Sequence, residues 1–397
     1  MLATHIVCSA PATAAPVIVG IDILLDKRID LIAGKRVGLV TNPSAVDGKL
    51  VSTMDRLRRD PRVQLTQLFA PEHGIAGALA NGSSGKNGVD KQIGLPVEGL
   101  FGRHHGPTAK ALGRIDVLVF DIQDIGSRTY TYISTLGKMM QAATKAKVPM
   151  IVLDRPNPQG GLLFEGPIRA QKYKSLIGWA PLPVTHGMTV GELARFYNGE
   201  LNLGTQLTVV PMEGWRRAMH WEDTGLEWIP TSPGIPHALN AHLYVATGMV
   251  GGSGANMNEG AGNSMPFEII GSTFIHAADF VELMQKEGLE GLVFRALTYK
   301  PKRGQFAGKV VQGVQLLLRD RQIFRPLRTA LVALIVLHKA YPKQLKVTNI
   351  RKFGRVWGND AVLKQIMAGK GWREIEASWA PELQEFAQKR QKYLIYQ

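Results

Sequence analysis

Cysteine is almost absent from this sequence of 397 residues, in which Cys8 stands alone. One cysteine excludes an intramolecular disulfide and a metal site built from several cysteines. The sequence also has no run of about 18 apolar residues, so it predicts no transmembrane helix. Its longest apolar stretch, residues 329–337, suits one buried helix of a globular domain.

Nucleotide and metal signatures are missing as well. None of the 43 glycines belongs to a G-x-G-x-x-G pattern or to a phosphate-binding loop, so a dinucleotide cofactor is not expected. No H-E-x-x-H spacing occurs, and a metal site would rest only on scattered residues such as His73, His186 and Asp154. We therefore expect no cofactor and no metal, and a metal-dependent hydrolase is the weakest alternative.

Negative charge is scarce toward the carboxyl terminus. The formal net charge is +15, and residues 272–397 hold 22 Lys and Arg against 10 Asp and Glu. Such a surplus favours anionic partners, for example an acidic cell-wall polymer, nucleic acid or a membrane surface. The basic residues are dispersed among apolar ones without a nucleic-acid-binding motif, so no nucleic-acid partner is expected.

The first sixteen residues are small and mostly apolar. They contain an Ala-x-Ala-like pattern, Ala12-Thr-Ala14, which resembles the end of a secretory signal, although a basic amino-terminal region is missing. An unstructured tail over residues 1–16 is the alternative interpretation. We expect a periplasmic or secreted protein, with a cytoplasmic location as the alternative.

Apolar strands alternate with helical segments between residues 17 and 247. This alternation predicts an α/β fold with a Rossmann-like, doubly wound parallel sheet. Residues 248–397 are predicted to form a smaller, basic α+β domain. Thr189 and Glu192 predict a capping box at the start of a helix. The predicted strands lie near residues 35–43, 63–69, 116–121, 148–154 and 207–211, and one predicted helix lies near 135–146.

Polar side chains gather where the predicted strands end. Residues 116–132 are the densest case, since an apolar strand is followed at once by Asp121, Gln123, Asp124 and Arg128. Ligands of open α/β sheets bind outside the carboxyl ends of the strands, so a small-molecule or sugar site is expected there. A solvated loop that caps the next helix is the alternative.

Glu72 is the first candidate for a catalytic group. It follows an apolar strand and stands in Pro71-Glu-His-Gly74, on a tight turn at the same edge of the sheet. A partly desolvated carboxyl group there can serve as a general acid near neutral pH. A glutamate that only caps a helix or pairs with an arginine is the alternative.

Further carboxylates and arginines are predicted to reach this edge. Two carboxylates that flank one bond suit glycoside hydrolysis, and Asp121 is the second candidate catalytic residue, with Asp124 and Glu165 nearby. Arg128 and Arg155 could bind a substrate carboxylate through two hydrogen bonds, or could pair with neighbouring aspartates instead.

Aromatic, amide and imidazole side chains complete the predicted site. The two tyrosines of the segment 116–132 could stack on sugar rings, although aromatic residues more often belong to the core. Besides the carboxylates and arginines, the candidates for substrate contact are Asn42, His73, Gln123, Tyr130, Tyr132, Asn157 and His186.

Five motifs together resemble the exo-β-N-acetylmuramidase (NamZ-like) family, long catalogued as a domain of unknown function. The likeness runs from about Gly20 to the carboxyl-terminal Tyr393-Leu-Ile-Tyr396. The motifs are L-F-A-P-E-H-G (68–74), F-D-I-Q-D-I-G-S-R-T-Y-T-Y-I (120–133), L-D-R-P-N-P (153–158), E-G-P (165–167) and H-G-M-T-V-G-E (186–192).

This resemblance implies a Rossmann-like domain, a smaller second domain and an active site in the cleft between them. It implies removal of terminal, non-reducing N-acetylmuramic acid from peptidoglycan fragments, with the Glu of the P-E-H-G motif, here Glu72, as the catalytic acid. The lactyl carboxylate of muramic acid gives an arginine in the cleft a purpose. A second catalytic carboxylate or the acetamido group of the substrate could complete the mechanism, and both possibilities stay open.

The chain departs from the family pattern in two segments. Where the family has S-P-N before M-P, this sequence has S-P-G-I-P (232–236). Where the family has E-G-T-N and then S-E-G-R-G-T, this sequence has G-G-S-G-A-N (251–256) and N-E-G-A-G-N-S (258–264). Gly251 and Ala261 thus stand where the family has a Glu and an Arg. A muropeptide-binding protein with impaired catalysis is therefore the main alternative to a glycosidase.

Overall fold

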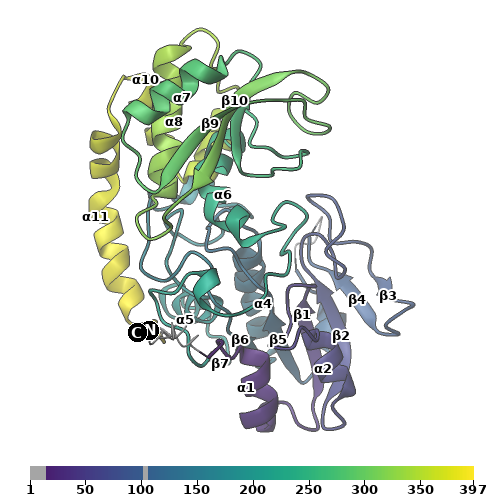
Figure 1. Ribbon diagram of the computed structural model, residues 1–397. Helices are drawn as coiled ribbons and strands as arrows, with labels where there is room; N and C mark the ends of the chain where they lie inside the picture. Colours follow the sequence, from purple (N-terminus) through teal and green to yellow (C-terminus); the bar gives the residue numbers. More distant parts are fainter. Residues whose placement is uncertain (1–14, 102–105) are drawn as a thin grey trace, which may run out of the picture.

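Two β-sheets of different size organise the chain, as the computed structural model shows (Figure 1). The structure describes residues 15–101 and 106–397. The first part of the chain builds the larger sheet and the last part the smaller one, with helix α6 (Ala238–Gly251) running between them. The predicted fold, a Rossmann-like α/β sheet followed by a smaller α+β region, is confirmed.

The larger sheet has seven strands among the described residues, in the order β3-β4-β2-β1-β5-β6-β7. Every neighbouring pair is parallel except β3 with β4. The order reverses at β1, which lies between β2 and β5, and such a switch point is where open α/β sheets bind ligands. The strands are β1 (Arg36–Thr41), β2 (Gln64–Ala70), β3 (Gly88–Val89), β4 (Pro96–Gly99), β5 (Val117–Asp121), β6 (Met150–Leu153) and β7 (Leu207–Val210).

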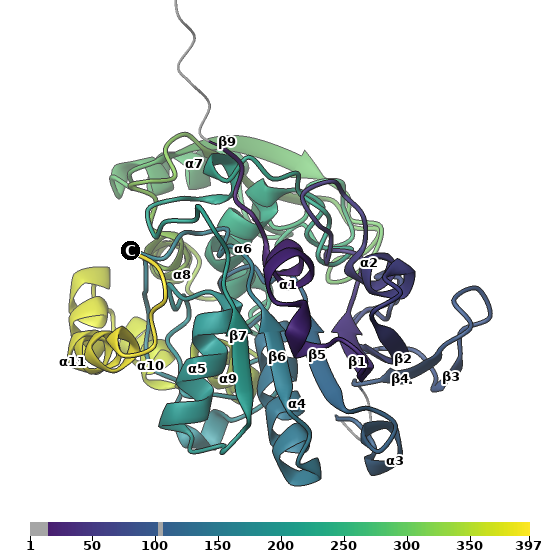
Figure 2. The same ribbon diagram turned by 90° about the horizontal axis from the view of Figure 1, so that it is seen from below.

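Helices cover both faces of this sheet (Figure 2). Along β5, Leu118 and Phe120 pack in the core with α4 and α5, whereas Val117 and Val119 pack in the core with α1 and α2. Successive side chains of a strand point to opposite faces, so a strand covered on both sides is a continuous apolar run in the sequence. The covering helices are α1 (Gly20–Lys27), α2 (Thr53–Arg59), α3 (Ala109–Leu112), α4 (Tyr132–Ala146) and α5 (Val190–Glu200).

The start of α5 has a side-chain cap, whereas the start of α4 has none. The predicted capping box of α5 is confirmed, because Thr189 accepts a hydrogen bond from the Glu192 backbone and the Glu192 side chain reaches back. The start of α4 lies earlier than the predicted residue 135, at Tyr132, and the preceding Thr131 makes no capping hydrogen bond with its side chain. Local sequence therefore specified the first start and not the second.

The smaller sheet is antiparallel, in the order β8-β10-β9. It packs with α7 and with α8, and residues 329–337 of α8 are buried, as predicted. The elements of this region are β8 (Ile269–Ser272), α7 (Ala277–Lys286), β9 (Leu292–Tyr299), β10 (Val311–Leu318), α8 (Pro326–Ala340), α9 (Ile350–Trp357), α10 (Ala361–Met367) and α11 (Trp372–Gln391). Short 3₁₀ helices are η1 (Ile29–Leu31), η2 (Gln171–Tyr173) and η3 (Trp221–Asp223).

The last helix joins the two regions along one side of the molecule. Helix α11, yellow in Figure 1, runs past both regions, so that the chain ends beside α5 and β7. The predicted boundary between residues 247 and 248 falls inside α6. In the part of the chain that the structure describes, no helix is both long and apolar enough to cross a membrane.

Candidate active site

Four parallel strands deliver polar side chains to one edge of the larger sheet. In the pairing of β1 with β5, Thr41 lies opposite Asp121, so the segments after both strands start at the same level. The loops that follow β2 and β6 begin at the same edge because these strands run in the same direction. This edge, at the switch point of the sheet, is the candidate active site.

Glu72 lies on the tight turn after β2 and is half-buried. Its Oε1 accepts a hydrogen bond from the Gly82 backbone N–H at 2.7 Å, and its Oε2 accepts one from Thr131 Oγ1 at 2.7 Å. The turn is held in a left-handed conformation at His73, with φ of 73°. The His73 ring approaches the Leu79 carbonyl at 2.9 Å, which fixes the imidazole against the loop. Glu72 is thus a carboxyl group held by two donors at the sheet edge.

A buried hydrogen-bond network joins Asn42, Tyr130 and Tyr132 to Thr231. Asn42 Nδ2 donates to the Tyr132 hydroxyl at 3.0 Å, and the Tyr132 hydroxyl donates to the Thr231 carbonyl at 2.5 Å. The Tyr130 hydroxyl lies 2.8 Å from Thr231 Oγ1, and the two tyrosine rings meet edge to face at 4.8 Å. Burial raises the pKa of both phenols, so both are neutral hydrogen-bonding groups. Stacking of these rings on a sugar stays a prediction.

Asp121 is completely buried and paired with Arg155. Arg155 donates to both carboxylate oxygens, through Nε and, at 2.9 Å, through a terminal nitrogen. Thr53 Oγ1 donates to the same carboxylate at 2.5 Å, and Arg155 also donates to the Val46 carbonyl at 2.9 Å. The two charges compensate each other inside the protein. A catalytic role for Asp121 and substrate binding by Arg155 therefore stay predictions.

Gln123 and Asp124 are buried but incompletely hydrogen bonded. Gln123 Nε2 donates to the carbonyls of Asp124 and Pro156 at 2.7 Å, and the Gly126 N–H donates to Asp124 Oδ2 at 2.8 Å. Gln123 Oε1 and Asp124 Oδ1 have no partner within the described ranges. Burial raises the pKa of Asp124 to about 7. Hydrogen bonds from the backbone N–H groups of Gly126 and Ile125 partly oppose this shift. Asp124 is thus a buried carboxyl group that titrates near neutral pH.

Arg128 connects the sheet edge with the second region. One terminal nitrogen donates to the carbonyls of Ile177 at 3.2 Å and Arg355 at 3.3 Å, and the other donates to the Val356 carbonyl at 2.7 Å. Arg355 and Val356 belong to the last turn of α9, so the guanidinium caps the carboxyl end of that helix. Burial, with the charge of Arg169, lowers the pKa of Arg128 to about 9. Binding of a substrate carboxylate by Arg128 stays a prediction.

Glu165 reaches the start of α8. Its Oε2 accepts a hydrogen bond from the Leu327 N–H at 3.2 Å, and Arg325 stands 3.9 Å from Oε1. Burial raises the pKa of Glu165 to about 7, and the Arg325 charge opposes this shift. Together with Trp372, Glu165 also lines a surface hollow of about 430 Å³. Glu165 thus links the loop after β6 to the first turn of α8.

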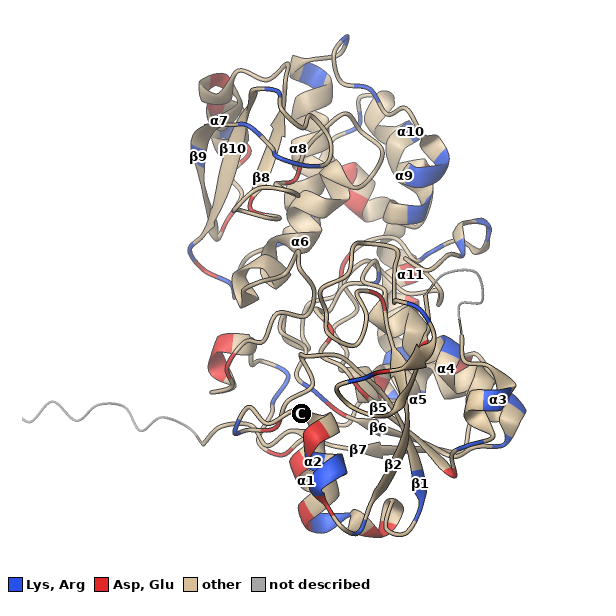
Figure 3. Ribbon diagram, turned by 90° about the vertical axis from the view of Figure 1, so that its right-hand side faces the viewer, with Lys and Arg blue, Asp and Glu red and all other residues tan. Residues whose placement is uncertain are grey.

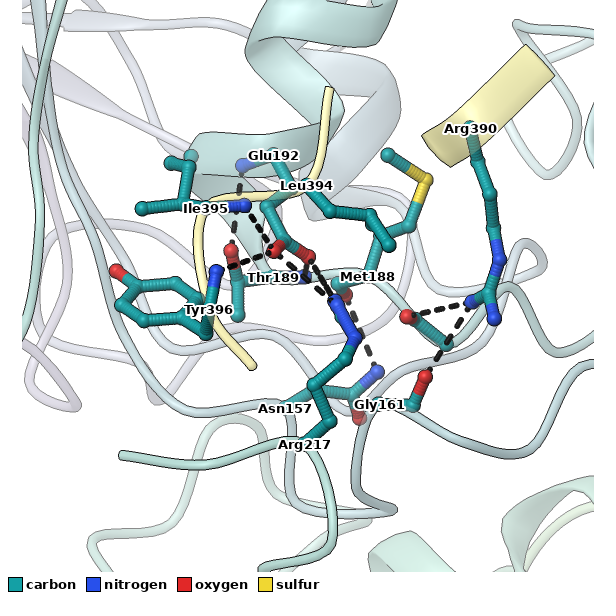
Figure 4. Close-up of polar contacts among 12 residues, drawn as sticks. Asn157, Gly161, Met188, Thr189, Glu192, Arg217, Arg390, Leu394, Ile395 and Tyr396 are labelled. Carbon is teal, nitrogen blue, oxygen red and sulfur yellow. Dashed lines mark hydrogen bonds and ion pairs between the residues drawn. The ribbon is translucent and has the colours of Figure 1, made fainter. Parts of the chain in front are cut away.

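Asn157 and His186 hold together the loops that follow β6 and precede α5. Asn157 Nδ2 donates to the Met188 carbonyl at 3.1 Å (Figure 4), and the Met188 N–H donates to His186 Nδ1 at 3.2 Å. Arg390 donates to the His186 carbonyl at 3.3 Å. Burial, with the nearby Arg390 charge, lowers the pKa of His186 to about 3. The imidazole is therefore neutral at physiological pH.

The carboxyl-terminal residues fold back onto the same loops (Figure 4). The Ile395 N–H donates to the Glu192 carboxylate at 2.8 Å, and Arg217 pairs with that carboxylate at 2.6 Å. The Tyr396 hydroxyl donates to Asp154 at 2.6 Å. The last residues of the chain thus support the loop that leaves β6.

Sequence reasoning missed two residues beside this edge, namely Thr131 and Tyr244. Thr131 donates to Glu72, and the Tyr244 ring meets Tyr130 edge to face at 5.9 Å. Burial raises the pKa of the Tyr244 phenol to about 12, and the negative charges of Glu72 and Glu259 add to this shift. Tyr244 lies within an apolar helix and gives no signal in the sequence.

Scattered histidines are the candidate metal ligands of the sequence. Within residues 15–101 and 106–397, no group of three or more His, Cys, Asp or Glu could hold a metal ion. His104, His105 and Cys8 lie outside the described residues. The expectation of a site without metal or cofactor stays a prediction.

The chain is similar to known proteins over almost its whole length. The families described as "Exo-beta-N-acetylmuramidase NamZ, N-terminal" and "Exo-beta-N-acetylmuramidase NamZ, C-terminal" match residues 37–239 and 242–396. The peptidoglycan beta-N-acetylmuramidase NamZ of Bacillus subtilis (strain 168) is 40% identical over 377 residues, which cover 95% of this chain and 91% of that protein. The two families meet near the start of α6, whereas the predicted boundary follows residue 247.

Two crystal structures of DUF1343 family proteins from Bacteroides fragilis have the same architecture. The first has a TM-score of 0.89 at 36% identity, covering 97% of this chain and 100% of the other. The second has a TM-score of 0.77 at 28% identity, covering 96% and 99%. Both sheet regions are therefore shared with these proteins.

Proposed function

Because this chain belongs to the NamZ family of exo-β-N-acetylmuramidases, we propose that it is an exo-acting glycosidase that releases terminal, non-reducing N-acetylmuramic acid from peptidoglycan fragments. Glu72 is the catalytic acid/base residue of this proposal. The substrate class comes from the relative in Bacillus subtilis, whose name gives peptidoglycan as its target.

The position of Glu72 is the observation that carries this assignment. Its carboxyl group is half-buried at the switch point of the sheet, and no cation pairs with it among the described residues. Asp121 and Asp154, at the ends of β5 and β6, are instead completely buried, and other side chains of the protein donate hydrogen bonds to them. A group that exchanges protons with a substrate must be within reach of that substrate, and Glu72 meets this requirement best.

Positive charge on the second region suits an anionic polymer. Figure 3 shows Lys and Arg on α9 and on several loops of the region that carries the smaller sheet. Peptidoglycan fragments carry the lactyl and peptide carboxylates, so a basic surface raises their local concentration. A periplasmic or secreted location belongs to the same proposal; it rests on residues 1–16, of which 1–14 lie outside the described residues.

The Glu72→Gln variant tests this function. On the disaccharide of N-acetylmuramic acid and N-acetylglucosamine, we expect the wild-type protein to release free N-acetylmuramic acid from the non-reducing end. The variant should lose about 10²- to 10⁴-fold in kcat/KM, the usual contribution of a positioned proton-transfer group. Release is measured by chromatography of the products.

Glu282→Gln is a matched control, since Glu282 is exposed on α7 and forms an ion pair with Lys286 on the same helix. It should leave the rate unchanged. Equal rates for Glu72→Gln and wild type would exclude Glu72. Saturable binding of the disaccharide to the wild-type protein with no release would favour the muropeptide-binding alternative.

A further inference from the structure

Thr131 holds Glu72 from the buried side of the candidate active site. Its hydroxyl group donates a hydrogen bond to Glu72 Oε2 at 2.7 Å. Glu72 follows β2 and Thr131 immediately precedes α4, so this bond joins two segments that are 59 residues apart in the sequence. Thr131 is buried, whereas Glu72 is half-buried. The contact therefore fixes the carboxyl group of Glu72 against the start of a helix.

Neighbouring contacts leave the backbone of Thr131 little freedom to move. The tyrosines on either side of it, Tyr130 and Tyr132, are both hydrogen bonded to Thr231, at 2.8 and 2.5 Å. The Thr131 carbonyl accepts hydrogen bonds from the backbone N–H of Thr135 at 2.9 Å and from the Thr135 hydroxyl at 3.2 Å. A hydroxyl group that is held in place before a substrate arrives needs no reorganisation during the reaction.

The second partner of Glu72 differs from Thr131 in what it can do. Oε1 accepts a hydrogen bond from the backbone N–H of Gly82 at 2.7 Å, and a backbone N–H can only donate. A hydroxyl group can donate a hydrogen bond and can also accept one. A protonated carboxyl group has one carbonyl oxygen and one hydroxyl oxygen, and the Gly82 N–H needs an acceptor at Oε1. Oε2 is therefore the oxygen suited to carry the proton, because its partner Thr131 suits both protonation states.

We propose that Thr131 is a positioning residue for Glu72 and that the exchangeable proton of Glu72 is held on Oε2. This inference rests on the proposed function, because it concerns the acid/base residue of that reaction. In the free acid, Oε2 donates to the Thr131 hydroxyl oxygen. When the proton passes to the glycosidic oxygen and the bond from this oxygen to C1 breaks, Oε2 becomes negative and the Thr131 hydroxyl turns to donate to it. The water that adds to C1 returns a proton to Oε2 and restores the acid.

The other groups beside Glu72 are neutral near pH 7 or directed elsewhere. Within residues 15–101 and 106–397, the charge of Glu72 acts on Tyr132, at the start of α4, and on Tyr244, in α6. Burial raises the pKa of both phenols, and the charge of Glu72 adds to this shift. The His73 ring lies 2.9 Å from the Leu79 carbonyl. The hydrogen bonds to its two oxygens are therefore the contacts that stabilise the ionised form of Glu72.

The Thr131→Val variant removes the hydroxyl group and keeps the shape of the side chain. On the disaccharide of N-acetylmuramic acid and N-acetylglucosamine, we expect kcat to fall by about 10- to 100-fold, the usual effect of losing a hydrogen bond to a charged group. KM should stay within about twofold of wild type, because an interaction that acts only on the catalytic group changes kcat. Thr131→Ser, which keeps the hydroxyl group, should retain kcat within about threefold.

The pH–rate profile separates this role from a loss of packing. Glu72→Gln should abolish the limb of the profile that Glu72 sets. In Thr131→Val the same limb should move to higher pH by about one unit, because the ionised carboxylate loses a donor. In Thr131→Ser the limb should stay in its wild-type position.

Thr135→Val is the matched control. Thr135 is also a buried threonine at the start of α4, and its hydroxyl donates to the Thr131 carbonyl instead of to Glu72. Its kcat should stay within about twofold of wild type. Thr131→Val combined with Glu72→Gln should lose no more than about twofold beyond Glu72→Gln alone, since Thr131 acts through Glu72. Thermal unfolding of each variant shows whether it is folded.

The outcomes for this inference and for the proposed function can be told apart. If the wild type releases N-acetylmuramic acid and Thr131→Val has an unchanged kcat and an unmoved limb, the role of Thr131 alone is overturned. Equal losses in Thr131→Val and Thr135→Val, or a Thr131→Ser variant as slow as Thr131→Val, would overturn it as well. A wild-type protein that releases no N-acetylmuramic acid would overturn the proposed function and this inference with it.

Discussion

Asp124 is a buried carboxyl group whose protonation is coupled to folding. Its pKa is raised from 3.8 to about 7, chiefly because burial disfavours the charged form. The folded state therefore binds a proton more tightly than the unfolded state does. This contribution to stability is complete below about pH 4 and is lost as the pH rises through about 7.

Asp124→Asn should remove this dependence on pH. The difference in unfolding free energy between variant and wild type should shift in favour of the variant by roughly 1 kcal/mol per pH unit between the two pKa values. Urea unfolding at pH 5 and pH 8 measures the shift. Asp30→Asn, at an exposed position, should show no such trend, and parallel behaviour of both variants would contradict the coupling.

At the scale of elements, Arg128 fastens α9 to the larger sheet. Three carbonyls of two separate segments accept its hydrogen bonds, and a lysine has no planar guanidinium with which to reach all of them. The contacts stabilise the carboxyl end of a helix that lies 228 residues further along the chain.

Arg128→Met should destabilise the protein by about 3 kcal/mol, since buried carbonyls lose charge-assisted hydrogen bonds. The shift appears in the denaturation midpoint. Arg355→Met removes an exposed side chain from α9 itself and should cost less than about 0.5 kcal/mol. Equal effects of the two substitutions would show that the cap contributes nothing.

Local patterns predicted the elements of this fold well and the partners of its polar residues poorly. Apolar runs and the capping box at Thr189 are local, and they gave β5 and the start of α5 correctly. The start of α4 was missed because Thr131 lacks the extended backbone of a capped start and its side chain makes no capping hydrogen bond. The sequence predicts a catalytic carboxylate at Asp121. In the structure, both oxygens of this carboxylate accept hydrogen bonds from Arg155, and this pairing depends on the register of neighbouring strands.

At the scale of the whole molecule, the last residues of the chain pack on the first region. The backbone from Leu394 onward hydrogen-bonds to the first region at several points, including the Arg195 guanidinium at 3.3 Å and the Arg217 N–H at 2.8 Å. The Tyr396 hydroxyl also accepts a hydrogen bond from the Met212 N–H at 2.9 Å. The two regions are thus joined at α6 and again by the tail.

Deleting residues 394–397 should lower the free energy of unfolding by about 3 kcal/mol or more, because buried Glu192 and Asp154 each lose a donor. Tyr396→Phe, which removes a single hydroxyl group, should cost about 1–2 kcal/mol. Guanidinium chloride titrations compare the three proteins. If the deletion variant had the same denaturation midpoint as the wild type, the carboxyl-terminal residues would not contribute to stability.

The carboxyl-terminal residues are synthesised long after the residues that they contact. Chains are synthesised from the amino terminus, and domains generally fold as units in that order. Here Glu192 and Asp154 leave the ribosome 203 and 242 residues ahead of their partners Ile395 and Tyr396. Arg217 and Thr189, which lie close in sequence, contact these carboxylates first, and Ile395 and Tyr396 add the last hydrogen bonds to them.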